Sequence, residues 1–106
     1  MANPSPLSWK VEPLPGASKA TFAIAGSEGL LTPGCLREIG LPHEVEGREN
    51  GGLVFSGRGP IWLYAHLVHL AHPFAWVAVH DPRLAGAVVI SRHVPDAPPL
   101  GAVIPL

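Results

Sequence analysis

The feature that most constrains the fold is a stretch of helical character between two short, continuously apolar runs. The runs are "GLVFS" (52–56) and "WVAVHD" (76–81), and each has the length and composition of a buried strand. Between them, residues 60–72 repeat apolar side chains with the period of an α-helix. A helix between two buried strands predicts a compact α/β fold whose sheet is partly parallel.

The outer strands follow from other patterns. The segments "LSWKVEPL" (7–14) and "SKATFAIAG" (18–26) alternate apolar and polar residues around Pro15-Gly16, which predicts a hairpin. A further buried strand is expected at 86–93, and the apolar residues 102–106 are expected to add an edge strand.

A short helix is expected before the first buried run. Thr32 suits the N-cap and Pro33 suits the first helical position, and Gly40 and Pro42 end the pattern. The polar residues 43–52 then form a loop. The element order is therefore ββαβαββ, in one domain spanning residues 1–106.

Charge and composition limit the classes of function. The net charge is −1 with 7 Lys and Arg, too few for the basic stripe that binds a long nucleic acid, although a small anionic ligand remains possible. Only 14% of the residues are charged, against about 25% in an average protein. Part of the apolar surface is therefore expected to lie in a homo-oligomer interface.

The remaining features bear on location and assembly. The single cysteine, Cys35, excludes an intrachain disulfide and indicates a reducing cytoplasm, and no segment reads as a signal peptide or a membrane span. On the expected helix, one broad half must face the sheet and holds Ile61, Leu63, Tyr64, Leu67, Val68, Leu70 and Ala71, and the other half holds Trp62, His66, His69 and His72. This half is too apolar for open water, and we expect it to meet a second subunit.

The segment "SGRGP", residues 56–60, links the first buried run to the helix. Glycines allow close approach of a phosphate to the backbone, the helix N-terminus attracts an anion, and Arg58 adds a forked donor. The alternative is a tight structural turn with no ligand. Both interpretations are open from the residues alone.

A second group of polar residues ends the strand at 76–81. His80, Asp81 and Arg83 lie where an α/β sheet commonly holds its ligands. A carboxylate can hold a divalent metal, an imidazole can move a proton, and a guanidinium can stabilise a charged phosphoryl transition state. The alternative for Asp81 and Arg83 is an ordinary turn with a surface ion pair.

The runs "SGRGPIWLYAHLVHLAHP" and "VAVHDPRLAGAVVISRH" resemble a family of small CRISPR-associated proteins of type III systems. These are manganese-dependent ring nucleases that cleave cyclic tetraadenylate, and their fold is a reduced, Rossmann-like relative of the CRISPR-associated Rossmann domain. The resemblance is specific from about residue 52 to residue 93. It implies a homodimer, with the ring pressed between two dimers that stack head to tail.

The resemblance also implies roles for particular residues. The catalytic set would be His72, Asp81 and Arg83. The metal, a divalent ion such as Mn²⁺, would be held by Asp81 with His69 and His93. The ring phosphates would lie against the turn, whose residues are Ser56, Gly57, Arg58, Gly59 and Pro60.

Two other functions fit the same residues. One is a manganese-dependent 3′-exonuclease that trims adenylate ends from linear RNA. The other is a non-catalytic module that only binds the cyclic messenger or assembles on it. The ring nuclease, a cyclic oligoadenylate phosphodiesterase that switches off antiviral signalling, is the leading hypothesis.

Overall fold

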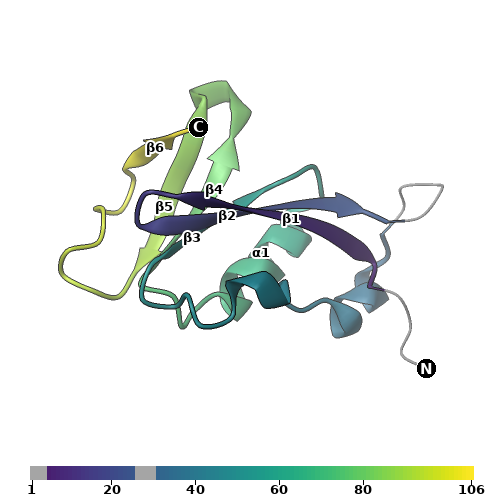
Figure 1. Ribbon diagram of the computed structural model, residues 1–106. Coiled ribbons are helices and arrows are strands. Elements are labelled where there is room, and N and C mark those ends of the chain that lie inside the picture. Colours follow the sequence, from purple (N-terminus) through teal and green to yellow (C-terminus); the bar gives the residue numbers. More distant parts are fainter. Residues whose placement is uncertain (1–4, 26–30) are drawn as a thin grey trace.

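The computed structural model describes residues 5–25 and 31–106, which form a six-stranded mixed sheet (Figure 1). Its strands are β1 (Leu7–Leu14), β2 (Ala17–Ile24), β3 (Gly52–Ser56), β4 (Trp76–Asp81), β5 (Gly86–Arg92) and β6 (Val103–Pro105). They lie in the sheet in chain order. The β2–β3 and β3–β4 pairs are parallel and the other pairs are antiparallel. The predicted α/β fold, small, Rossmann-like and partly parallel, is confirmed.

Both parallel connections cross the same side of the sheet (Figure 1). The first runs through two 3₁₀ helices, η1 (Pro33–Glu38) and η2 (His43–Val45), and the second through the helix α1 (Ile61–Leu70). Leu63, Leu67 and Ala71 of this connection are fully buried against the sheet, with Leu53 and Phe55 of β3 in the same core. Removing this apolar surface from water stabilises the α1 layer.

A smaller core lies on the other side of the sheet. Val54, Trp76 and Val89 are buried there, and the segment after β5 covers them with Ala97 and half-buried Val94 and Ala102. Gly52 has no side chain because the Trp76 indole occupies that space: a Cβ on Gly52 would lie 2.1 Å from the ring. The proline-rich tail is therefore part of the core.

The strand predictions for 7–14, 52–56 and 76–81 match the observed bounds. The predicted strand 18–26 is observed as 17–24, and its residue 26 lies outside the described residues. The expected helix at 33–39 is a 3₁₀ helix, in which Thr32 forms no side-chain cap hydrogen bond. Proline and glycine in the first two helical positions leave too few good helix formers for an α-helix.

The predicted division of the α1 faces was partly wrong. Ile61, expected against the sheet, is 87% exposed, because it is the first residue of α1 and its side chain tilts toward the helix N-terminus, away from the packed turns. Trp62 is half-buried and packs against the main core. The His66 Nε2 lies 2.9 Å from the Ile39 carbonyl oxygen. Part of the helix face that was expected to meet a second subunit therefore contacts Ile39, which follows η1 in the same chain.

No helix in the described ranges, 5–25 and 31–106, combines the length and the hydropathy needed to cross a membrane.

Candidate functional site

The parallel strands β3 and β4 end side by side, at the edge of the sheet where α1 begins. Phe55 pairs with Val79 in the register, which places Ser56 beside His80. The Ser56 hydroxyl and the His80 Nδ1 are 2.8 Å apart and form a hydrogen bond. Ser56 is 7% exposed, so its hydroxyl is occupied in orienting the imidazole. The ends of these strands and their neighbouring turns are here called the carboxyl edge.

The turn between β3 and α1 requires glycine for packing reasons. Gly57 has a φ of +137°, and a Cβ there would lie 2.5 Å from the Phe22 carbonyl oxygen. A Cβ on Gly59 would lie 2.9 Å from the Phe22 ring. The Tyr64 hydroxyl donates a 2.6 Å hydrogen bond to the Gly57 carbonyl, and burial raises the pKa of Tyr64. Packing alone therefore accounts for the two glycines, without a ligand.

Arg58 is held between these two glycines and is exposed. It forms no ion pair with any residue in the part of the chain that the structure describes. Pro60 is the N-cap of α1, and the first backbone N–H groups of that helix face the same edge. A free guanidinium beside a helix N-terminus favours an anionic ligand. The turn therefore combines two glycines that the packing requires with one exposed, positively charged arginine.

Asp81 and Arg83 form the surface ion pair that was the alternative interpretation of this turn. The Asp81 carboxylate accepts hydrogen bonds from Arg83 Nη2 at 2.9 Å, from Nε at 3.2 Å and from the backbone N–H at 2.9 Å. These hydrogen bonds lower the pKa of Asp81 below its ordinary value, and the carboxylate raises the pKa of Arg83. Asp81 is therefore held ionised, with both carboxylate oxygens bonded to Arg83.

Two adjoining cavities open at the carboxyl edge. The smaller, of about 210 Å³, is lined by Ser56, Gly57, Arg58, Tyr64, His80 and Pro82. The larger is a groove of about 630 Å³, lined by Gly59, Ile61, Tyr64, Val79, His80, Asp81, Pro82, Arg83, Val88 and Ile90. Tyr64, His80 and Pro82 belong to both linings, so the cavities are neighbours.

The remaining predicted histidines lie at the opposite edge of the sheet. His72 follows α1 and His93 follows β5, and their rings meet edge to face with centroids 4.5 Å apart. The His93 Nδ1 lies 3.1 Å from the Phe74 carbonyl oxygen. When Nδ1 donates this hydrogen bond, Nε2 keeps its lone pair and can bind a metal. This surface, with the exposed His69, is here called the amino edge.

The structure thus brings together only part of the predicted site. Asp81, Arg83 and the 56–60 turn share the carboxyl edge, while His72, His69 and His93 belong to the amino edge. The six residues of β4 separate the two edges by about 17 Å. Within residues 5–25 and 31–106, no three His, Cys, Asp or Glu side chains of one chain converge on a metal position. One chain alone does not assemble the predicted catalytic set or the predicted metal ligands.

Sequence reasoning placed His80 with Asp81 and named Ser56 only as part of the turn, so it missed the hydrogen bond between Ser56 and His80. The signal was available, because Ser56 and His80 each end a buried strand and parallel strands end at the same edge. The role of Tyr64 in holding the turn was also missed. Its hydroxyl reaches back seven residues along the chain, which no local pattern predicts.

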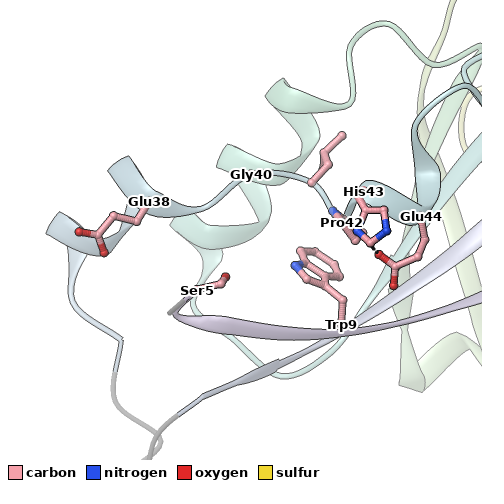
Figure 2. A pocket seen from close by; sticks show the side chains of 8 residues that line it. Ser5, Trp9, Glu38, Gly40, Pro42, His43 and Glu44 are labelled. Carbon is pink, nitrogen blue, oxygen red and sulfur yellow. Dashed lines mark ion pairs between the residues drawn. The ribbon is translucent and has the colours of Figure 1, made fainter. Parts of the chain in front are cut away.

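Another pocket, of about 420 Å³, lies between β1 and the 3₁₀ segments (Figure 2). The Trp9 side chain extends from β1 toward the segment that carries Pro42 and His43. The lining includes Glu38 and Glu44 but neither lysine nor arginine, and Glu44 pairs with His43 at 3.2 Å. This pocket is unsuited to an anion, whereas the carboxyl edge carries the exposed Arg58 beside the N-terminus of α1.

The Arg83→Ala variant is expected to raise the pKa of Asp81 back toward its ordinary value, because the hydrogen bonds to its carboxylate are lost. Because the pKa of Asp81 is lower in the folded state than in the unfolded state, the Asp81–Arg83 pair makes a small contribution to the free energy of unfolding at pH values above the unfolded-state pKa. That contribution disappears as the pH falls through the folded-state pKa. Carboxyl ¹³C NMR titration checks the shift, with Arg37→Ala as the control. If Asp81 has the same pKa in Arg83→Ala as in the wild type, the hydrogen bonds from Arg83 do not lower that pKa.

Comparison with known proteins agrees with these features. The family model described as "CRISPR-associated protein (Cas_csx3)" matches residues 24–105, well over half of the chain. An uncharacterized protein of Aquifex aeolicus (strain VF5) is 49% identical over 67 residues, which are 62% of this chain and 60% of that protein. The match thus spans less than two thirds of that relative's length. The matched range contains both strand ends, the turn and all the candidate histidines, and the chain belongs to the Cas_csx3 family of CRISPR-associated proteins.

Proposed function

We propose that the protein is a metal-dependent phosphodiesterase that cleaves cyclic tetraadenylate and so switches off type III CRISPR antiviral signalling. The observation that carries the proposal is the carboxyl edge. Arg58 is free of ion pairs with the described residues, the N-terminus of α1 adds positive potential, and His80 is oriented by Ser56. These are the groups that a small phosphodiester ring requires.

The site is proposed to be shared between copies of the chain. His72 and His93 lie at the amino edge, about 17 Å from Asp81 along β4. A head-to-tail contact between homodimers brings the carboxyl edge of one copy against the amino edge of the next. A ring between them then meets the turn from one side and His72 from the other. Because such a contact does not close on itself, it propagates into a filament.

The proposed metal ligands follow the same division. Asp81 of one copy offers a carboxylate, and His93 of the next offers an imidazole whose Nδ1 already faces the Phe74 carbonyl. His69 is an additional candidate at the same edge. Oxygen and imidazole donors together suit Mn²⁺. When bound, a divalent ion supplies Lewis acidity toward a phosphoryl oxygen.

The chain's own residues are given distinct tasks in this proposal. Arg58 and the turn hold the ring phosphates in place. Arg83 neutralises the charge that develops on the phosphoryl oxygens, and its pairing with Asp81 positions it for this. His72 transfers a proton to or from the ring at the attacked phosphodiester.

Thin-layer chromatography with cyclic and linear tetraadenylate, with and without Mn²⁺, tests the activity. Cleavage of the ring only in the presence of Mn²⁺ supports the ring nuclease. Trimming of the linear substrate with the ring intact indicates an exonuclease, and tight binding with no product indicates a binding module. Either of these last two results overturns the proposal.

The Arg58→Ala variant is expected to bind cyclic tetraadenylate at least tenfold more weakly, since a hydrogen bond to a charged group contributes about 1.5–3 kcal/mol. Calorimetric titration in EDTA measures affinity without turnover. Arg37→Ala removes an equally exposed arginine of η1 and is expected to bind normally. Equal affinities for the wild type and Arg58→Ala, with an intact fold, rule out a phosphate contact at Arg58.

A further inference from the structure

The groove at the carboxyl edge has apolar walls that the proposed phosphate contacts do not use. Ile61 of α1 is 87% exposed and Ile90 of β5 is 41% exposed, and both line the groove together with Val88. Exposing large apolar side chains around a cavity is costly in water unless something covers them. The volume of about 630 Å³ is in the range of small-molecule sites.

The position of the groove indicates what covers it. It shares Tyr64, His80 and Pro82 with the smaller cavity at the Arg58 turn. A ligand that places its phosphate at Arg58 therefore extends directly into the groove. Such a ligand is anionic at one end and apolar and flat at the other, which is the character of a nucleotide.

We infer that this groove receives an adenine base of the oligoadenylate whose phosphate lies at the Ser56–Pro60 turn. The inference rests on the proposed function and adds a base subsite to it. Ile61 and Ile90 supply apolar contacts for the faces of a purine.

The arrangement also assigns His80 a position between base and phosphate. Its Nδ1 is bonded to the Ser56 hydroxyl, so only Nε2 is available to the ligand. A pyrimidine ring is smaller and fills less of the groove. The apolar walls therefore favour adenine over uracil, because a purine covers more of Ile61 and Ile90.

The test compares Ile90→Ser with the control Val103→Ser. Val103 is 44% exposed on the neighbouring strand β6 and lies outside the groove lining, so the two substitutions remove similar exposed apolar surface. Affinity for cyclic tetraadenylate and for its uridylate analogue is measured by calorimetry in EDTA. Circular dichroism confirms that both variants are folded, and sedimentation records their oligomeric state.

We expect wild type and Val103→Ser to prefer the adenylate ring. Ile90→Ser is expected to bind that ring about tenfold more weakly, a loss of about 1.4 kcal/mol, and to lose much of the preference over uridylate. Unchanged affinity and preference in folded Ile90→Ser overturn the base subsite. Dissociation of the dimer by Ile90→Ser, with base preference retained, also overturns it and makes the groove an interface between copies.

Adenosine monophosphate is the second probe, and it separates this inference from the proposed function. Binding of the monophosphate that is weakened by Ile90→Ser supports the base subsite even if the wild type neither binds nor cleaves the ring. In that case only the ring nuclease proposal fails. A wild type that binds neither the monophosphate nor the ring overturns both.

Discussion

A mixture of the His72→Ala and Arg58→Ala proteins is expected to cleave cyclic tetraadenylate faster than the sum of the two separate rates. His72→Ala should bind the ring nearly normally and cleave it about 10²–10⁴-fold more slowly, the usual cost of losing a general acid or base. Arg58→Ala keeps its amino edge but holds the ring weakly. In a head-to-tail contact between the two proteins, each supplies what the other lacks, because the turn and His72 lie at opposite edges.

The size of the rescue is informative. In a random equal mixture, roughly a quarter of ordered neighbour pairs combine an intact turn with an intact His72 across the contact. The matched control mixes Arg58→Ala with the Arg58→Ala/His72→Ala double variant. No copy in this mixture has an intact turn, so no rescue is expected. If the mixture of the two single variants is no faster than the sum of their separate rates, the shared site is contradicted. The rates of the single variants then show whether the protein is a ring nuclease.

The Gly57→Ala variant is expected to lose about 3 kcal/mol or more of folding free energy, or to fail to fold. Its Cβ would lie 2.5 Å from the Phe22 carbonyl oxygen, and this backbone atom of β2, which is paired with β1, cannot move aside cheaply. A φ of +137° adds strain for any residue with a side chain. Chemical denaturation monitored by circular dichroism measures the loss.

Gly47→Ala is the control for this prediction. Gly47 also has a positive φ, +81°, but nothing lies within 4 Å of the position of its Cβ. It therefore carries the conformational strain without the contact, and a loss of only about 1 kcal/mol is expected. Equal losses for the two variants would show that the contact with Phe22 contributes nothing.

Much of the fold could be predicted from the sequence because its determinants are local. The continuous apolar run "GLVFS" and the apolar start of "WVAVHD" are buried strands, and the Pro15-Gly16 turn joins an antiparallel hairpin. The alternation of apolar and polar residues, and the continuous apolar runs, indicate which side chains are buried on folding. In a small domain this pattern predicts the secondary structure. The partly parallel sheet followed from the helix between its central strands.

The predictions that failed depend on what covers a surface. Helical periodicity assigned Ile61 to the core and Trp62 to the half away from the sheet, but Ile61 is exposed and Trp62 packs against the main core. Periodicity describes the angle of a side chain around its helix. It does not include where the helix begins relative to the sheet, or the residue after η1, Ile39, whose carbonyl meets His66.

The residue types at the site could be identified from the amino-acid sequence: a glycine turn with an arginine, an Asp-Pro-Arg turn and a set of histidines. Their division between two edges of the sheet is a property of the folded chain. The parallel register brings Ser56 to His80 and the turn to Asp81, whereas α1 runs back across the sheet and carries His72 to the opposite edge. The distance between these groups depends on where each side chain lies in the folded sheet, which residue types and their spacing in the sequence do not specify.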